Sequence, residues 1–594
     1  MNGATNPRVF VGQDGLVPKD CDSKSRAGPR DSEPAAWKLH TLVAAIGFAL
    51  FIIALSGFPN LMDNERRVAS YVLDAVQNGH WAIQKDATGE LASKPPLLTW
   101  LAALGTLAFG KINLAALYLP NALAAIGVAL ILVHTGKRHF GWTAGWLAGL
   151  TYLLCPVGAM QMRSVRYDGL LALPVTLGAL AAYAAWSRQN RWVWFWLAAA
   201  AGTLVKGPIA VVLAGAGLLA HVWEKRTGKE SVLRGSHFLG VLCYLMIVVG
   251  WLWSAYQQMG HPVIDKLLGR ELIAHATGAG RNESMLLGFY VPPLSVLTGF
   301  APWSLLAGVG LWRVWKEPHP DPEQRRFERF LFCWFLGGLL LFAIAAHQRS
   351  RLVQPLLPAA ALLAGRELAR LLRVWSSARL ARAVAFSTAL FLAAAILYHH
   401  LLMGYTADVQ RTVAVRELAR RVRAQLNGGA ALVHVDSPFA LQFYLNTDRP
   451  MVPAGRAAEL LRGDLPAYVA VSNSEKFAAH LQPNPPVLYE IIPWPGPEKS
   501  AVRILSNRPL PPVIDQASAL LGPLLLRLDG AELLRANLRE LVIRPLRAPS
   551  SIQVKNESSV RQEARLRLMG STSRGTTADT NLSLGSGEMW TYQQ

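Results

Sequence analysis

Charged residues are scarce in this sequence. Asp, Glu, Lys and Arg make up 16% of its 594 residues, whereas an ordinary soluble domain carries about a quarter. Hydrophobic residues account for 52% of the chain, and the mean hydropathy is +0.25. The shortage of charge excludes an ordinary soluble protein and predicts a multi-pass membrane protein.

Cysteine is also scarce, and its spacing carries no metal signature. The chain has four cysteines, without any Cys-x-x-Cys pair, and three of them lie in apolar segments. This excludes a disulfide framework or a zinc site of the usual spacing. We expect Cys155, Cys243 and Cys333 to be small buried side chains.

Acidic residues are fewer than basic ones, 38 against 59, which gives a formal net charge of +21. Such an excess can indicate nucleic-acid binding, but no zinc motif or recognition-helix motif accompanies it. In a membrane protein, the positive-inside rule and anionic headgroups explain the excess first. The lipid bilayer is therefore a predicted partner, and nucleic acid is not.

The first 37 residues lack an apolar core and are rich in Pro, Gly, Asp and Lys. This composition predicts a disordered cytoplasmic tail and argues against a cleaved signal peptide. The first apolar segment is then a retained membrane anchor.

About eleven segments are long and apolar enough to cross a membrane, since a spanning helix needs about 20 such residues. The apolar stretch 97–110 is shorter, and it either lies at the interface, re-enters or spans. The predicted spans are 39–57, 114–135, 141–159, 169–186, 192–205, 208–223, 237–255, 288–311, 329–346, 352–365 and 383–402.

The basic residues decide the orientation. If 97–110 does not span, the Lys/Arg-rich connections 136–141, 187–191, 223–230, 312–329 and 365–383 all fall on the side of the N-terminus. That side is predicted to be cytoplasmic. The unusual polar loops then gather on the outer face.

Beyond residue 405 no further convincing span follows. Short apolar runs alternate with helix-like pieces up to about residue 509, which predicts a small α/β domain, and strand-like pieces separated by Ser, Gly, Asn and Thr then predict a β-rich, sandwich-like domain. The predicted fold class is thus a mainly α-helical multi-pass membrane protein with a C-terminal, outer-face soluble α/β plus β region. The predicted parts are a tail (1–37), a membrane domain (38–404), an α/β domain (405–509) and a β-rich domain (510–594).

The polar stretch after the first anchor is the most unusual in the chain. Asp63, Glu65, Arg66 and Arg67 lie within five residues and precede an amphipathic run. A lone acid there would be a solvated flank or a helix cap. Two acids beside two arginines also fit a general base near the membrane surface, where partial desolvation raises the pKa of a carboxyl group and an arginine restrains it.

Two further polar segments face the same predicted side. Residues 162–168 (MRSVRYD) place Arg163, Arg166 and Asp168 between apolar spans, either as an Arg-Asp clamp or as a source of another carboxylate. Lys206 ends a span, where a lone lysine usually reaches toward headgroups. Together with Lys94, it is also a candidate ligand for a phosphate.

The long loop 256–287 contributes four more candidates. Arg270 and Arg281 are candidate phosphate ligands, and Glu271 and His275 are candidate supporting residues. The histidines of this loop are too few and scattered to predict a metal site.

The order of these motifs resembles the bacterial polyprenyl-phosphate-sugar glycosyltransferases of the GT-C class, related to the lipid A aminoarabinose transferase and to protein O-mannosyltransferases. The family patterns Asp-Glu-x-Arg-Tyr-Ala, Gly-Asp-Trp, Glu-Lys-Pro-Pro-Leu, Arg-x-Asp, Thr-Lys-Gly-Pro and Pro-Trp-Ser have six counterparts here, in order. The resemblance covers roughly residues 39–405 and continues weakly to about 510. The counterparts are 63–69, 79–81, 93–97, 166–168, 205–208 and 302–304.

Two positions depart from the family pattern. Asn64 stands where the leading Asp is expected, with Asp63 one residue earlier, so the resemblance leaves open which acid is the base. Ser93 replaces the Glu before Lys-Pro-Pro, a residue that holds a divalent metal in some relatives. No cofactor is therefore expected to be required, and a divalent metal is doubtful.

The resemblance implies transfer of a sugar from undecaprenyl phosphate, or a similar polyprenyl phosphate, to a hydroxyl of a glycan, lipid or protein, with inversion at the anomeric carbon. Asp63 or Glu65 would act as the base, helped by Asp168. The implied phosphate ligands are Lys94, Lys206, Arg270 and Arg281, and the implied supporting residues are Arg67, Arg166, Glu271 and His275. The implied location is the bacterial inner membrane, with the C-terminal region in the periplasm.

Two rival functions stay open. A lipid-linked glycan transporter would bury ionisable groups in mid-span, often in repeated halves, whereas here the charges collect at span ends and no internal repeat is visible. A non-catalytic envelope-glycan assembly protein would use the C-terminal domains for its contacts.

Overall fold

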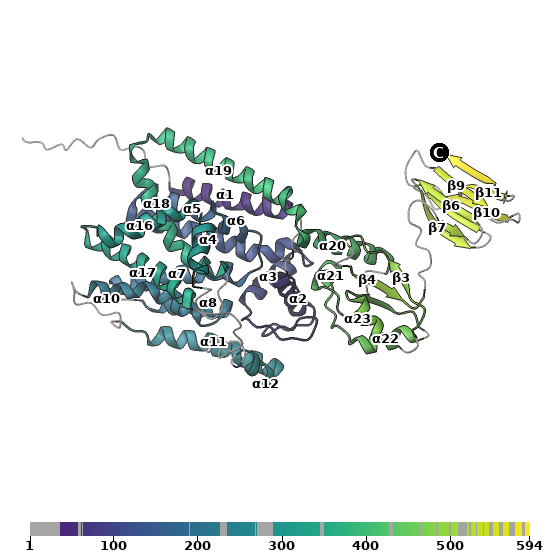
Figure 1. Ribbon diagram of the computed structural model, residues 1–594, viewed down its shortest axis with the longest axis horizontal. Helices are drawn as coiled ribbons and strands as arrows, with labels where there is room; N and C mark the ends of the chain where they lie inside the picture. The colour runs from purple at the N-terminus through teal and green to yellow at the C-terminus, as the bar shows by residue number, and fades with distance from the viewer. Residues whose placement is uncertain are drawn as a thin grey trace, which may run out of the picture.

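The structure is a computed structural model, and its elements fall into three parts along the chain: a helical bundle, a small α/β unit and a β-rich unit (Figure 1). The described residues are 36–57, 61, 63–188, 191–225, 235–267, 269, 289–344, 350–426, 432–463, 465–482, 485–497, 501–508, 519–521, 524–529, 531–537, 540–545, 551–556, 562–569, 576–584 and 588–593.

The bundle is built almost entirely from apolar helices, some of which are extended by short 3-10 turns. In chain order they are α1 (Ala36–Ser56), α2 (Asp63–Gln77), α3 (Leu97–Ala108), α4 (Leu114–Phe140), α5 (Trp142–Leu153), α6 (Pro156–Gln161), α7 (Tyr167–Arg188), α8 (Val193–Lys206), α9 (Ile209–Gly215), η1 (Ala216–Leu219), α10 (Ala220–Glu224), α11 (Phe238–Met259), α12 (His261–Ile264), α15 (Val291–Gly299), α16 (Ser304–Lys316), α17 (Pro322–Ile344), η3 (Ser350–Leu356), α18 (Leu357–Leu371), η4 (Leu372–Val374), α19 (Ser377–His400) and η5 (Leu402–Tyr405).

Six described helices are long and apolar enough to cross a membrane, or seven if the bent pair α15 and α16 counts as one span. The six are α1, α4, α7, α11, α17 and α19, and each lies where a span was predicted. The integral membrane bundle is thus confirmed, but the predicted count of eleven is supported only in part. Several predicted spans are shorter or broken: 141–159 is divided between α5 and α6, and 208–223 between α9, η1 and α10.

The helices at the rim of the bundle turn apolar side chains outward. On α11, Phe238 is 77% exposed and Trp253 is 61% exposed, and on α19 Phe386 is 70% exposed. Figure 1 shows these two helices along opposite sides of the bundle. Such surfaces suit lipid, since a soluble protein rarely exposes large contiguous apolar patches.

Helix α3 covers most of the stretch 97–110, for which interfacial, re-entrant and spanning positions were predicted. Its 12 residues rise only about 18 Å, which is too short for a bilayer core of about 30 Å. Leu98, Ala102 and Ala103 are buried, whereas Leu104 and Leu107 are more than half exposed. This one-sided burial fits an interfacial helix, and the helix leads directly out of the long loop that follows α2.

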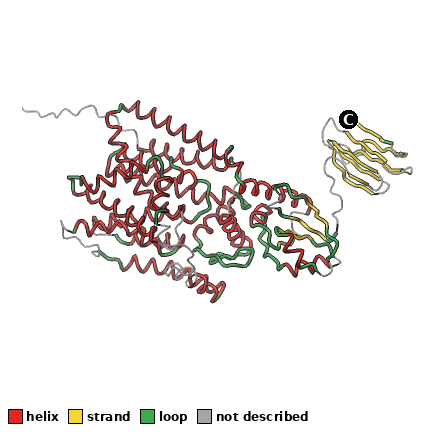
Figure 2. The backbone as a smooth tube through the Cα atoms, viewed as in Figure 1, coloured by secondary structure: helices red, strands yellow, loops and turns green. Residues whose placement is uncertain are grey.

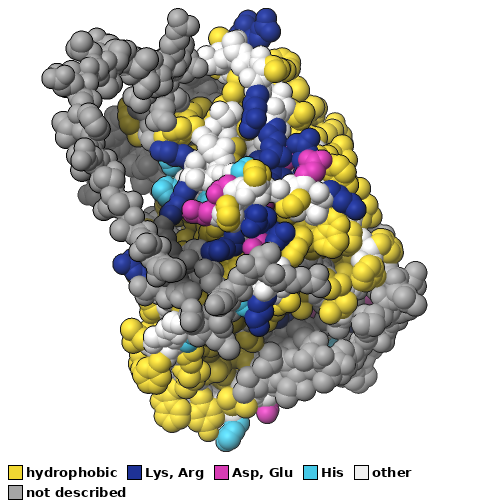
Figure 3. All heavy atoms as spheres, turned by 90° about the vertical axis from the view of Figure 1, so that its left-hand side faces the viewer, with side chains coloured by type: hydrophobic (Ala, Val, Ile, Leu, Met, Phe, Trp, Pro, Cys, Tyr) yellow, Lys and Arg dark blue, Asp and Glu magenta, His cyan; other side chains and the backbone are white. Residues whose placement is uncertain are grey.

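The two ends of the bundle differ. We call the end that carries the α2–α3 loop (78–96) the loop end, and the opposite end the basic end. Figure 3 looks at the basic end and shows Lys and Arg side chains gathered there. Two predicted basic connections are shorter than expected: α18 continues to Leu371, so Arg366 lies inside a helix, and α16 and α17 reduce the connection 312–329 to 317–321.

The α/β unit follows α19 and contains a four-stranded sheet of order β1-β2-β4-β3. Strands β1 and β2 are parallel, and β4 is antiparallel to both β2 and β3. Its elements are α20 (Ala407–Gln425), β1 (Leu432–His434), α21 (Phe439–Leu445), α22 (Ala454–Arg462), β2 (Tyr468–Val471), α23 (Ser474–Ala479), β3 (Tyr489–Ile492) and β4 (Arg503–Ser506).

The last part of the chain is β-rich, and Figure 2 shows its described residues mostly as strands. Two four-stranded sheets have the orders β11-β10-β8-β7 and β12-β9-β6-β5. The sandwich arrangement of these sheets stays a prediction. The strands are β5 (Ala519–Leu521), β6 (Leu524–Asp529), β7 (Ala531–Asn537), β8 (Glu540–Pro545), β9 (Ser551–Asn556), β10 (Gln562–Met569), β11 (Thr576–Leu584) and β12 (Met589–Gln593).

Candidate active site

The α2–α3 loop is held by buried acids that sequence reasoning did not single out. Asp86 is 4% exposed, and its carboxylate lies 3.1 Å from Nε of Arg67. The same arginine lies 3.3 Å from Glu90, which also pairs with Lys266. Arg67 thus ties the start of α2 to the loop, and its predicted supporting role in the site stays a prediction.

A second buried acid organises the end of α2. Asp74 is 3% exposed and accepts hydrogen bonds from the backbone N–H of Lys85 at 2.7 Å and from the side chain of Asn78 at 2.9 Å. Nδ1 of His80 lies 2.8 Å from the same carboxylate. These contacts fold the chain back on itself immediately after α2, because one carboxylate binds three groups from the loop that follows.

Helix α11 supports the loop from the other side. Nε1 of Trp251 donates to the carbonyl of Ala82 at 2.8 Å, and Gln258 bonds both the N–H of Ala82 and the carbonyl of Ile83. An apolar cluster lies beneath, and it includes Tyr71, Ile83, Ala92, Leu204, Trp251 and Val263. The cluster joins α2, the loop, α8, α11 and α12 into one support.

Asp168 and Lys206 meet at the loop end. Asp168 is in the first turn of α7, Lys206 is the last residue of α8, and Nζ of the lysine forms an ion pair with the aspartate. Both side chains are mostly buried, with 18% and 17% exposed. The lysine is therefore paired with a carboxylate inside the protein, and a small part of each side chain stays accessible from outside.

The start of α7 is also tied to α3. The side chains of Tyr167 and Thr99 are hydrogen-bonded, and Thr99 follows the Lys-Pro-Pro turn by three residues. Lys94, in that turn, is half-buried. Three motifs that are distant in sequence thus belong to one region: Lys-Pro-Pro, Arg-x-Asp and Lys-Gly-Pro.

Buried amides fix the loop that precedes Asp168. Asn121, in α4, is 0% exposed and donates to the carbonyls of Ser164 at 2.7 Å and Arg166 at 3.0 Å. Gln161 donates to the carbonyl of Gly169 at 2.7 Å. Arg163, which the clamp hypothesis placed near Asp168, has Nη1 2.7 Å from Nδ1 of His399 in α19. These contacts hold the backbone on both sides of Asp168.

The α/β unit docks on the loop end through residues 446–451. Gln77 bonds the carbonyl of Asn446 at 2.9 Å and the N–H of Asp448 at 2.8 Å. The N–H of Met451 donates to the carbonyl of Ala87 at 2.6 Å. Figure 1 shows α21 beside α2 at this junction. The α/β unit is therefore part of the wall around the α2–α3 loop.

Two carboxylates come close at this junction. Asn78 donates to Asp74 at 2.9 Å and to Asp448 at 2.6 Å, so one amide bridges both acids. Burial, with the nearby charge of Asp74, raises the pKa of Asp448 to about 7. Burial also raises the pKa of the Tyr71 hydroxyl far above its usual range, so that group stays protonated.

The side chains of several predicted site residues are not among the described parts of the structure. Asp63 begins α2 and Glu65 lies in its first turn, but their side chains are outside the described residues. Arg270, Glu271, His275 and Arg281 are also outside the described residues. Arg166 is described through its backbone carbonyl, which binds Asn121. The predicted catalytic and phosphate-binding roles of all these residues stay predictions.

Asp74, Asp86, Asn121 and Asp448 belong to the candidate site, and the sequence analysis did not single them out. Asp74 lies in α2 and Asp86 in the loop that follows, both between the motifs at 63–69 and 93–97, so their proximity to the motifs was a usable signal. Asn121 and Asp448 gave no such signal, because the contacts that matter join them to residues more than 40 positions away. Among the described residues, no group of three or more His, Cys, Asp or Glu is arranged to hold a metal ion.

Comparisons with known proteins point in one direction. Residues 93–253 match a family described as dolichyl-phosphate-mannose-protein mannosyltransferase. An uncharacterized protein of Aquifex aeolicus is 27% identical over 42% of this chain and 58% of its own length. The undecaprenyl phosphate-alpha-4-amino-4-deoxy-L-arabinose arabinosyl transferase 1 of Pseudomonas fluorescens is 24% identical over 57% of this chain and 58% of its own length. This chain spans less than two thirds of these curated relatives.

The fold also has a solved counterpart. The crystal structure of ArnT from Cupriavidus metallidurans bound to undecaprenyl phosphate is similar, with a TM-score of 0.64 and 20% identity, over 80% of this chain and 99% of that one. At this identity the likeness shows a shared fold. With the family match and the relatives, it confirms the resemblance to the GT-C glycosyltransferases that the motif order indicated.

Proposed function

We propose that this protein is a membrane glycosyltransferase that moves a sugar from a polyprenyl-phosphate donor to an acceptor hydroxyl on the outer face of the bacterial inner membrane. The observation that carries the proposal is the meeting of three motifs at the loop end, where Asp168 pairs with Lys206 and Tyr167 bonds Thr99. The family match and the relatives named as transferases support it. The C-terminal units then lie in the periplasm.

The chemistry requires a base and cations. The acceptor oxygen attacks the anomeric carbon, the bond from that carbon to the phosphate oxygen breaks, and the polyprenyl phosphate leaves with the bonding electrons. A carboxylate accepts the acceptor proton, and Asp63, Glu65 and Asp168 are the candidates. Attack from the face opposite the phosphate inverts the anomeric carbon.

The ion pair gives Lys206 a specific role. The lysine is held by one carboxylate at the end of α8, and a donor phosphate competes for the same ammonium group. Transfer of the lysine to the phosphate would neutralise the leaving group and release Asp168 to accept a hydrogen bond or proton from the acceptor. Lys94, Arg270 and Arg281 are the further proposed phosphate ligands. Cations can stabilise a monophosphate leaving group without a metal, so chelators should not abolish transfer.

The surrounding parts have proposed roles as well. The polyprenyl chain would lie along the apolar helices, beside the interfacial helix α3, whose Leu104 and Leu107 face outward. The docked loop 446–451 would frame the entry of a glycan, lipid or protein acceptor. Arg67 would keep its supporting role by holding Asp86 and Glu90.

The test is sugar transfer by the full-length protein in membranes, with undecaprenyl-phosphate-linked aminoarabinose and mannose as donor probes and isolated envelope fractions as acceptors. Asp63→Asn, Glu65→Gln and Asp168→Asn are compared with Arg379→Gln, which changes an exposed residue of α19. Loss of a general base lowers the rate by about 10²–10⁴-fold, and we expect this in at least one carboxylate variant. Full activity in all three would refute the carboxylate mechanism. A wild-type protein that moves lipid-linked sugar across the bilayer without transferring it would refute the enzyme proposal.

A further inference from the structure

A second candidate binding site lies at the basic end. A cavity of about 490 Å³ is lined by side chains from α1, α4, α7 and α17, and its size is within the range of roughly 300–1,000 Å³ that small-molecule sites occupy. It lies at the opposite end of α7 from Asp168, since it includes Ser187 near the helix's last residue. It is therefore separate from the candidate active site.

The lining changes from apolar to polar along the helices. On α4, Leu130, His134 and Arg138 follow one another at intervals of four residues and so share one helix face. On α7, Leu180 and Ser187 repeat the same order. Eight residues of helix correspond to about 12 Å, so the cavity runs from an apolar inner part to a polar mouth over that length.

The mouth carries one charge of each sign. Arg138 comes from the last turn of α4 and Glu323 from the first turn of α17, and both side chains are exposed. Both charges lie near the Tyr183 side chain, as do Arg326 and Asp321, and the Tyr183 hydroxyl donates to the backbone carbonyl of Glu323 at 3.4 Å. Arg138 and Glu323 therefore frame one opening, in which a cationic and an anionic group of a ligand would each find a counterpart.

The cavity also lies at headgroup depth. Helices α1, α4, α7 and α17 are all candidate membrane spans, and the cavity is lined by residues near the ends of these spans. Figure 3 shows that this end of the molecule is rich in Lys, Arg and His. An apolar inner part at the membrane side and a polar mouth at the water side match the polarity of a phospholipid.

We propose that this cavity binds a membrane phospholipid with a primary amine in its headgroup, of the phosphatidylethanolamine type. Its phosphate would bind Arg138 with help from His134, its ammonium would donate to Glu323, and its first acyl carbons would lie against Leu130 and Leu180. A headgroup with net negative charge and no amine would face Glu323 without a cation. A choline headgroup has no N–H to donate.

The test measures which lipid the intact protein retains. The full-length protein is placed in nanodiscs that contain equal amounts of phosphatidylethanolamine, phosphatidylcholine and phosphatidylglycerol, and the lipids that stay bound in detergent are counted by native mass spectrometry. We expect phosphatidylethanolamine to be preferred about fivefold over each of the others, the size of one charge contact. Arg138→Gln should lose bound lipid, and Glu323→Gln should lose the preference over phosphatidylglycerol.

Controls keep the outcomes separate. Arg379→Gln removes an equal charge from an exposed position outside the cavity lining and should retain lipid as the wild type does. Arg138→Lys keeps a cation and should retain the preference, which guards against a simple folding defect in Arg138→Gln. Equal retention of all three lipids, or equal loss in Arg138→Gln and Arg379→Gln, would overturn the proposal. Displacement of the lipid by millimolar phosphoethanolamine or inorganic phosphate would overturn it in favour of a soluble phosphate ligand.

Discussion

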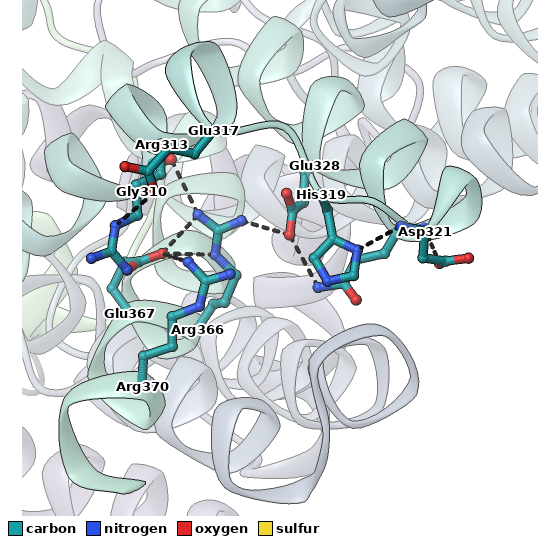
Figure 4. A network of polar contacts seen from close by, with 10 residues as sticks. Gly310, Arg313, Glu317, His319, Asp321, Glu328, Arg366, Glu367 and Arg370 are labelled. Carbon is teal, nitrogen blue, oxygen red and sulfur yellow. Dashed lines mark hydrogen bonds and ion pairs between the residues drawn. The ribbon is translucent and has the colours of Figure 1, made fainter.

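The two ends of the helical bundle use charge differently. At the basic end, Arg366 and Glu367 of α18 are 4% and 2% exposed, and Arg366 also binds Glu328 of α17 at 2.6 Å. Arg313 of α16 reaches Glu367 at 2.8 Å. Figure 4 shows how the side chains of three helices converge in this network. At the loop end, Asp168 and Lys206 form a pair that keeps nearly a fifth of each side chain exposed.

This difference separates charges that hold the fold from charges that are available to a ligand. A buried arginine that meets two carboxylates and the carbonyl of Gly310 has little left to offer a substrate. A single lysine that pairs with a single aspartate at the end of a helix, near the short helix α3, can change partner. The Arg366 network at the basic end is therefore expected to support stability, and the Asp168–Lys206 pair at the loop end is expected to support chemistry.

The largest expected effect concerns the Asp168–Lys206 pair. Asp168→Asn and Lys206→Gln should each lower transfer by about 10²–10⁴-fold, as expected when a base or the charge on a leaving group is lost. Only Lys206→Gln should also weaken binding of undecaprenyl phosphate, measured by titration of the purified protein. If the pair were only a structural clamp, the double variant would recover activity because no unpaired charge is left. Such a recovery would show that the Asp168–Lys206 pair is structural, like the Arg366 network at the basic end.

The next effect breaks the network at the basic end. Arg366→Met leaves Glu328 and Glu367 buried without their central partner, which should lower the free energy of unfolding by about 3–5 kcal/mol. Thermal unfolding of the purified protein measures this, and transfer per folded molecule should stay unchanged. Arg313→Met is the matched control. This side chain is 37% exposed, and its partner Glu367 keeps Arg366 and Arg370, so we expect a smaller loss of stability. Equal destabilisation by the two variants would contradict the account.

A smaller effect tests the positioning of Asp168. Asn121→Ala removes two hydrogen bonds to the backbone of the 162–168 loop, each worth about 1 kcal/mol. We expect a roughly tenfold loss of kcat with little change in KM for the donor. Thr176→Val is the control, since the Thr176 hydroxyl bonds only the carbonyl of Ala172 in its own helix among the described contacts. A loss of kcat as large in the control would mean that Asn121 acts through general packing.

The smallest effect is a pH dependence of the docked α/β unit. Burial and Asp74 raise the pKa of Asp448 to about 7, and Asn78, His80 and Asp86 also face this carboxyl group. Because the docked state binds a proton more tightly than the unfolded chain, docking should weaken as the pH rises from about 4 to 7 and stay weak above that. The change is on the order of 1 kcal/mol for a partly exposed group.

Hydrogen exchange of α21 at pH 5 to 8 measures this change. The wild type should lose protection as the pH rises, and Asp448→Asn should remove the dependence. Asp408→Asn, an exposed change in the first turn of α20, should leave it intact. An unchanged pH profile in Asp448→Asn would show that another group is responsible.

The sequence predicted most of the long helices of the membrane domain. Hydropathy located the six long spans, because a helix in lipid must be apolar over its whole length. It did not show the break between α5 and α6, where Pro156 begins a new helix, or the 116° bend between α15 and α16. Segments on either side of such breaks are equally apolar, so only packing against neighbouring helices reveals where one helix ends.

The sequence predicted part of the candidate site. The motifs placed Asp168 and Lys206 on one side of the membrane, but their ion pair depends on how α7 packs against α8. Asp74 and Asp86 look like ordinary polar residues of an amphipathic helix and a loop, because their importance comes from burial. Asp448 comes from a unit that follows the whole bundle, and no local pattern connects residues 74 and 448.

The most direct test of the central claim is photo-crosslinking with undecaprenyl phosphate that carries a diazirine next to its phosphate. The full-length protein is labelled in proteoliposomes, and the modified peptides are identified by mass spectrometry. Labelling should fall on residues 94–100, 163–168 and 203–208 at the loop end and should decrease in Lys206→Gln. Labelling that concentrates on α16, α17 and α18 at the basic end, and that is insensitive to Lys206→Gln, would contradict the assignment of the two ends.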